Sequence, residues 1–277
     1  RNTADFKKLR RSMALLILSE QQGGLLEGII NYINSCFHLD LIQFGTVVKE
    51  ISSRLGGFEE IVETIGKTEA AIAVASFRTW HPYVSVPALS EGEMFFHAED
   101  MVHPLLENPV PNSIQTEQCV LLTGSNASGK STFLKTAAVT ALLAQTIHTV
   151  TAVRYEGCCF RIFTSMALRD DLIGEESYFM VEIRSLKRIL DRIRGEVPVL
   201  CCVDEVLRGT NTIERIAASS KILESMAEKR MICFAATHDI ELTYLLEGIF
   251  RNCHFEEEVT EEDIQSRRPS GLRKTIN

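Results

Sequence analysis

The part of the sequence with the clearest chemistry is a glycine-containing loop. Its residues are Gly124, Ser125, Asn126, Ala127, Ser128, Gly129, Lys130 and Ser131, which match G-x-x-x-x-G-K-[ST] at every fixed position. Glycines in such a loop let backbone N–H groups close around phosphates, and the helix that follows adds positive potential. We predict that this loop binds the phosphates of ATP. We also predict that Lys130 reaches the β- and γ-phosphates as a catalytic residue and that Ser131 ligates Mg²⁺.

A second candidate site follows an apolar segment, where Leu200-Cys201-Cys202-Val203 leads into Asp204 and Glu205. A carboxylate at the tip of a strand can hold Mg²⁺ directly or through water. The acid beside it is suitably placed to orient or deprotonate an attacking water. We therefore predict Asp204 as a metal ligand and Glu205 as a catalytic residue.

His238 is the third candidate, because it directly follows the apolar segment Met231–Thr237. Polar residues at the carboxyl ends of strands in a parallel sheet lie at the edge where ligands bind. We predict that His238 contacts the γ-phosphate or the catalytic water.

These residues need a scaffold of alternating strands and helices. The strands that we expect are Gln118–Thr123, Arg161–Ser165, Val197–Asp204 and Met231–Thr237, and the helices are Lys130–Ile147, Tyr178–Ile193, Ile213–Lys229 and Ile240–Leu246. This alternation predicts an α/β fold with a mostly parallel sheet flanked by helices.

Residues 1–78 have a different character, with apolar residues at three- and four-residue spacing and glycine pairs, including Gly56-Gly57, that punctuate the pattern. Five prolines between Pro82 and Pro111 mark the change. We expect a small all-α segment at 1–78, an ATPase domain at 79–260 and a poorly structured tail at 261–277.

Composition limits the environment and the partners of the chain. Its 277 residues are 45% hydrophobic with a net charge of -8. No apolar run approaches the roughly 20 residues that span a bilayer, and the eight cysteines contain no C-x-x-C pair. We expect a cytoplasmic protein with reduced thiols, no membrane contact and little DNA affinity of its own, because DNA-binding domains are usually basic. The chain begins with Arg1, so we expect a fragment of a longer protein.

Five ordered motifs make the chain similar to the ATPase domain of MutS-type DNA mismatch-repair proteins. The loop from Thr123 to Thr132 resembles T-G-P-N-x-x-G-K-S-T, which adds Thr132 to the expected nucleotide-binding residues. The other four stretches are Ile162-Phe163-Thr164 with Asp170-Asp171-Leu172, Ser177 to Glu182, Asp204-Glu205 with Arg208-Gly209-Thr210, and Ala236-Thr237-His238 with Glu241-Leu242-Thr243.

The resemblance implies a P-loop ATPase of the ABC type that completes its Mg-ATP sites by forming a homodimer. Ser177 would contact the γ-phosphate bound to the other copy, and the loop Thr210-Asn211-Thr212 would cross the interface. His238 would sense the γ-phosphate. Residues 1–78 would be the end of the family's core and lever region, and DNA would be bound by domains absent from this chain.

Departures from the family pattern indicate a divergent branch. Ser125 replaces the usual proline, Ala127 the usual methionine and Tyr178 the usual threonine, and Leu207 stands where glycine often does. Two alternatives stay open. One is an ABC-type ATPase of another system, against which the Ser177 stretch speaks because it replaces L-S-G-G-Q. The other is a nucleotide-dependent interaction module with negligible hydrolysis, against which the full set of catalytic residues speaks.

Overall fold

The computed structural model describes residues 32–33, 35–52, 55–125, 128–166, 178–193, 197–207 and 211–256. The chain divides into two compact units, Arg1–Ala75 and Ser76–Asn277. The tail predicted at 261–277 lies outside the described residues. Within those residues, no helix combines the length and the apolar character that crossing a bilayer requires.

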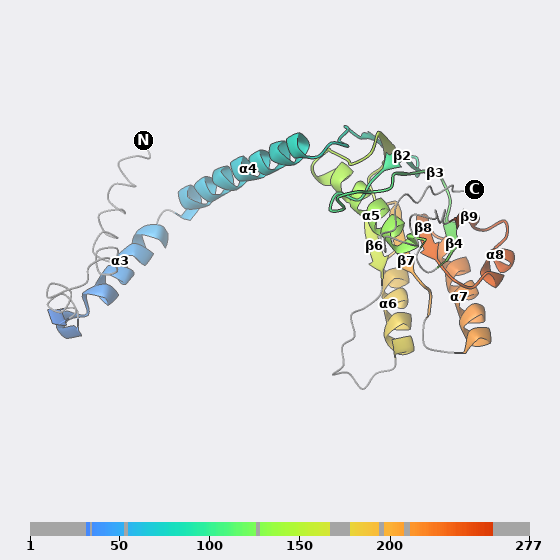
Figure 1. Ribbon diagram of the computed structural model, residues 1–277. Helices are drawn as coiled ribbons and strands as arrows, with labels where there is room; N and C mark the ends of the chain where they lie inside the picture. Colours follow the sequence, from blue (N-terminus) through green and yellow to red (C-terminus); the bar gives the residue numbers. More distant parts are fainter. Residues whose placement is uncertain are drawn as a thin grey trace, which may run out of the picture. The chain divides into compact units, whose positions relative to one another are not determined.

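The described part of the first unit is helical, as predicted. Helix α3 covers Leu39–Ser52, and helix α4 covers Leu55–Trp80 and continues into the second unit (Figure 1). Gly56-Gly57, expected to punctuate the helices, lie close to a helix boundary, since α3 ends at Ser52 and both glycines are in the first turn of α4. A glycine costs about 1 kcal/mol relative to alanine inside a helix, which the rest of a 26-residue helix can offset.

The second unit is built on a five-stranded sheet with the order β6-β7-β8-β4-β9, in which every neighbouring pair is parallel. Its strands are β4 (Val120–Gly124), β6 (Arg161–Ser165), β7 (Val199–Asp204), β8 (Met231–Ala236) and β9 (Arg251–Phe255). Strands β7 and β8 are buried along their whole length. They therefore appear in the sequence as continuous apolar runs.

Helices cover both faces of this sheet, as predicted for the fold class. The helices are α5 (Lys130–Thr146), α6 (Tyr178–Arg192), α7 (Thr212–Ala227) and α8 (Glu241–Leu245). One face, which includes Leu122 and Phe234, packs against α5. The opposite face, which includes Leu121 and Cys233, packs against α6, α7 and α8 (Figure 1). All four expected helices and four expected strands are confirmed, with ends that differ by at most two residues.

A second sheet of four strands was not predicted. Its order is β1-β5-β2-β3, with β1 at Ala88–Ser90, β2 at Phe96–Met101, β3 at Asn112–Thr116 and β5 at Arg154–Cys158. Strand β2 is antiparallel to both of its neighbours. Two of the five prolines expected to mark a change of character directly precede these short strands, Pro87 before β1 and Pro111 before β3. Phe96 joins the two sheets, because its ring packs edge-on against both Tyr155 and Phe234.

Candidate functional site

The site is positioned by the carboxyl ends of three adjacent strands, β4, β8 and β7. Leu122, Ala236 and Asp204 stand side by side in this order across the sheet. The backbone beyond them is tied in the same way: Thr237 N–H donates to the Leu122 carbonyl and Glu205 N–H to the Ala236 carbonyl, each at 3.0 Å. The residues that leave these strands therefore start from fixed positions on one edge.

The predicted phosphate loop leaves β4 at Gly124, where only glycine fits. Its φ is +146°, and a Cβ there would lie 2.7 Å from the Phe255 carbonyl oxygen and 2.8 Å from Ser128 Oγ. At the other end of the loop, Gly129 takes up a left-handed conformation as the N-cap of α5. The backbone conformation thus explains why both fixed positions of the motif are glycine. Asn126 and Ala127 lie outside the described residues.

Lys130 opens α5 and is buried, with 4% of its surface exposed. Its Nζ donates to the carbonyl oxygens of Gly124 at 2.8 Å and Ser125 at 2.7 Å. Burial lowers the pKa of this ammonium group, while the nearby carboxylates of Glu205 and Asp204 act in the opposite direction. The sheet edge thus brings the lysine of the loop close to Asp204, the last residue of β7, and to Glu205, which follows it.

Two polar groups at this edge are available to a ligand. Ser128 Oγ is fully buried and has no hydrogen-bond partner in the part of the chain that the structure describes. Asp204 is 9% exposed, and its carboxylate lies close enough to Lys130 to act on the pKa of that ammonium group. Buried polar groups without partners are costly, and carboxylate and hydroxyl oxygens are the ligands that Mg²⁺ prefers. Asp204, together with the hydroxyl of Ser131 beside Lys130, therefore fits a small hard cation.

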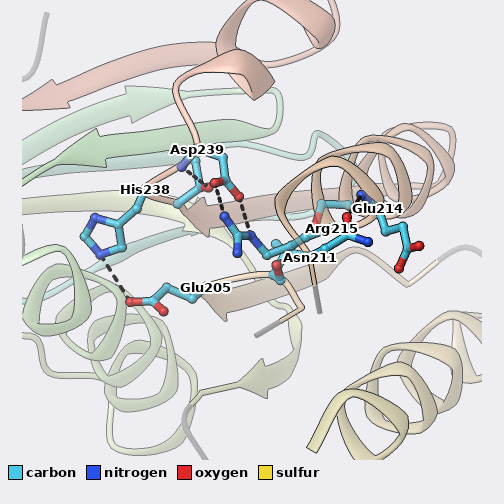
Figure 2. A network of polar contacts seen from close by, with 9 residues as sticks. Glu205, Asn211, Glu214, Arg215, His238 and Asp239 are labelled. Atoms are coloured by element: carbon cyan, nitrogen blue, oxygen red, sulfur yellow. Dashed lines mark hydrogen bonds and ion pairs between the residues drawn. The ribbon is translucent and has the colours of Figure 1, made fainter. Parts of the chain in front are cut away.

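Glu205 and His238 face each other beyond the strand ends. His238 Nε2 lies 3.1 Å from Glu205 Oε1, and both side chains are about one-third exposed (Figure 2). They line a pocket of about 230 Å³ with neighbours that include Thr237 and Arg215. Glu205 has φ 59°, in the left-handed region that non-glycine residues rarely adopt. Backbone strain of this kind concentrates at functional sites.

A second pair in this pocket, Arg215 and Asp239, was not predicted from the sequence. The guanidinium donates two hydrogen bonds to the carboxylate, Nε to Oδ2 at 2.9 Å and Nη2 to Oδ1 at 2.5 Å. This two-pronged contact raises the pKa of Arg215. Asp239 directly follows His238, and Arg215 lies four residues after Asn211, the N-cap of α7. These neighbourhoods indicate that each residue lies near the site, but they do not indicate that the two side chains meet.

The structure thus brings together Lys130, Asp204, Glu205 and His238, with Ser131 in the first turn of α5. Thr132 follows in the same turn, and its side chain is exposed. Asn211, expected in an interface loop, accepts a hydrogen bond from Glu214 N–H as the cap of α7. Ser177, Arg208 and Thr210 lie outside the described residues, so their predicted roles stay predictions.

Comparison with known proteins places this site in a family. Residues 120–269 match the family described as MutS domain V. The chain is 38% identical over 157 residues to the DNA mismatch repair protein MutS of Thermus thermophilus, which covers 55% of the chain and 19% of that protein. It is 30% identical over 238 residues to the protein of the same name from Natronomonas pharaonis. That alignment covers 82% of the chain and 27% of the relative. For the DNA mismatch repair protein MutS of Thermotoga maritima, the identity is 32% over 210 residues. That alignment covers 73% of the chain and 26% of the relative.

The chain therefore spans between about a fifth and about a quarter of the length of these relatives. The matched region begins at the first residue of β4 and includes the phosphate loop, Asp204, Glu205 and His238. The matched range covers the residues that meet at the strand ends, and this chain belongs to the MutS family.

Proposed function

We propose that this chain is an ATP-binding and ATP-hydrolysing dimerisation module of a MutS-type DNA mismatch-repair protein, with a P-loop site of the ABC type. The observation that carries the proposal is the meeting of Lys130, Asp204, Glu205 and His238 at one sheet edge beside a glycine-shaped loop. A charged lysine, a nearly buried carboxylate and an acid–imidazole pair are the parts that phosphoryl transfer to water requires.

The phosphate loop supports binding of a polyphosphate. Backbone N–H groups at the start of α5 and the Lys130 ammonium supply positive potential, and the carbonyls that Lys130 now contacts are weaker partners than phosphate oxygens. Ser131 and Asp204 would hold Mg²⁺, which neutralises charge on the β- and γ-phosphates when it is bound.

Glu205 and His238 support hydrolysis rather than binding alone. A carboxylate whose partner is an imidazole can accept a proton from water while the imidazole keeps it in position. Both side chains are about one-third exposed in the pocket that they line, so a water molecule can reach them. In the proposal Glu205 orients or deprotonates the attacking water, and His238 contacts the γ-phosphate or that water.

The second copy enters the proposal through the resemblance. Ser177 of each copy would contact the γ-phosphate bound by the other, and the residues before α7 would lie at the interface. ATP would then control the closing of two copies in the cytoplasm, and the helical residues 1–78 would relay that state to DNA-binding domains outside this chain. The acidic net charge of -8 supports assigning the DNA contact to those other domains.

The proposal is tested by measuring the ATPase rate of the chain at increasing protein concentration. We expect the rate per molecule to rise with concentration, because each site needs a second copy. Lys130→Ala should abolish ATP binding in calorimetry, and Ser177→Ala should lower turnover without lowering the affinity of the monomer for ATP. Sedimentation separates a self-sufficient monomer from a dimer that has already formed. A chain that binds ATP but never hydrolyses it, at any concentration, would identify the interaction module instead.

A further inference from the structure

We propose that Arg215 is a positioning residue for this reaction, because it holds Asp239 and so fixes the direction in which His238 faces Glu205. This inference rests on the proposed function for its kinetic consequence only. Its geometric content, the dependence of His238 on the Arg215–Asp239 pair, can be tested without ATP.

His238 stands between two anchored residues, Thr237 and Asp239. Before it, Thr237 is almost fully buried, and its N–H donates to the Leu122 carbonyl of β4 at 3.0 Å. After it, Asp239 is held twice: its N–H donates to Thr237 Oγ1 at 3.0 Å, and its carboxylate accepts both hydrogen bonds from Arg215. The backbone of His238 therefore cannot turn unless one anchor is released.

The anchor on Asp239 is a contact through two hydrogen bonds. A guanidinium and a carboxylate that meet through two parallel hydrogen bonds fix orientation as well as distance. The pair is also partly shielded, since the side chains are 27% exposed for Arg215 and 12% exposed for Asp239. Water competes less for such a pair than for an exposed one.

Arg215 reaches Asp239 from helix α7. It lies in the first turn of α7, which starts at Thr212 and is capped by Asn211. Figure 2 shows its guanidinium crossing from that helix to Asp239, while the His238 ring points to Glu205. The pair thus links α7, which follows the residues proposed to meet the second copy, to the segment that carries His238.

A double-mutant cycle tests the kinetic part. Arg215→Ala and Asp239→Ala should each lower kcat by about 10- to 100-fold, the loss that a misplacement of roughly 1 Å can cause. KM and the ATP affinity should stay within about twofold, because the phosphate loop is untouched. The double variant should be no slower than the slower single variant, because both substitutions remove the same contact. Arg215→Lys keeps the charge without the second hydrogen bond and should recover part of the rate.

Arg154→Ala is the matched control, because Arg154 also donates two hydrogen bonds to a carboxylate, that of Glu156, but in the second sheet. It should leave kcat unchanged. If Arg215→Ala slows turnover and Asp239→Ala does not, Arg215 acts on the phosphate itself and the inference is wrong. Wild-type turnover in both single variants would also overturn it.

The geometric part is read from the ring nitrogen signals of ¹⁵N-labelled histidines without nucleotide, with His238 assigned through His238→Gln. We expect the His238 signals to shift in both Arg215→Ala and Asp239→Ala, while those of His103, in the segment between β2 and β3, stay in place. Unchanged His238 signals overturn the inference even if the enzyme is active. If the wild-type chain does not hydrolyse ATP, the proposed function fails, and the ring signals still decide whether Arg215 positions His238.

Discussion

The guanidinium of Arg78 donates a hydrogen bond of 2.7 Å to Thr149 Oγ1 and thereby joins the last turn of α4 to the residues that follow α5. It also donates to the carbonyls of Ile147, at 3.1 Å, and His148, at 3.3 Å. Ile147 is the C-cap of α5. Carbonyls at the end of a helix lack partners within it and carry partial negative charge, so a cation is well placed there.

Replacing Arg78 by alanine should therefore destabilise the unit that contains α5. We expect the free energy of unfolding to fall by about 1 kcal/mol, a modest value because the side chain is exposed and screened by solvent. Urea denaturation of Arg78→Ala measures this, with Arg154→Ala as a control that should leave the midpoint unchanged. Equal midpoints for wild type and Arg78→Ala would show that water replaces the guanidinium without loss.

Gly124→Ala should damage both the fold and nucleotide binding. The new Cβ would meet the Phe255 carbonyl at 2.7 Å, so the loop or β9 must move. We expect a loss of about 2 kcal/mol or more in stability and at least a tenfold loss of ATP affinity. Gly248→Ala is the control, because Gly248 also has a positive φ of 78° but no atom within 4 Å of a Cβ. It should cost about 1 kcal/mol and leave ATP binding intact. Similar ATP affinities in both variants would contradict the steric argument.

Substitutions of Leu207 compare the loss of side-chain burial with the relief of backbone strain. The φ of Leu207 is 60°, and its side chain is fully buried against the face covered by α6, α7 and α8. Leu207→Ala should cost about 2 to 5 kcal/mol, because burial is lost and the strained φ remains. Leu207→Gly loses slightly more surface but relieves about 1 to 2 kcal/mol of strain. We therefore expect the glycine variant to be at least as stable as the alanine variant in thermal unfolding, the reverse of the usual order.

Glu205→Gln should separate binding from hydrolysis. The amide oxygen of glutamine can still accept from His238, so the pocket should keep its shape, but an amide cannot take a proton from water. We expect unchanged ATP affinity, turnover lowered at least about 100-fold, and a dimer that accumulates with ATP in sedimentation. Turnover at the wild-type rate would remove Glu205 from the chemistry.

The central sheet and its helices could be predicted because the burial of each element leaves a pattern of apolar residues in its own local sequence. Strands β7 and β8 are buried on both faces and appear as unbroken apolar runs, and α5 and α7 repeat apolar residues with helical spacing. Strand β9, Arg251–Phe255, was missed because it lies at a sheet edge and alternates buried with exposed residues over only five positions. The same applies to β3, Asn112–Thr116, which has mostly polar residues. The partner of β9 is β4, which is distant in the sequence, so the pairing is identified only in the folded chain.

The site residues also divide into those that local sequence indicates and those that depend on contacts between distant segments. The positions of Asp204, Glu205 and His238 could be predicted because each lies at, or within two residues of, the end of an apolar strand. The position of Lys130 could be predicted because it opens the helix after the glycine-containing loop. Arg215 and Asp239 could not be predicted, since they are separated by 24 positions and each, taken alone, looks like a charge on a solvated surface. Their meeting depends on how α7 packs beside β8 and α8, which the pattern of either segment does not encode.

The row formed by Leu122, Ala236 and Asp204 has a consequence for how this site can fail. Successive residues of a strand point to opposite faces, so a slip of one residue between β7 and β8 would turn the Asp204 side chain away from the phosphate loop altogether. There is no intermediate register in which the carboxylate is only slightly misplaced. When a site is formed by loops, changes in the loop sequence can shift its residues by fractions of an ångström. The strand ends here can shift only by whole residues, because the hydrogen bonds between β7 and β8 fix their pairing. Substitutions within the sheet should therefore either preserve the spacing of the acids from the loop or abolish it in one step.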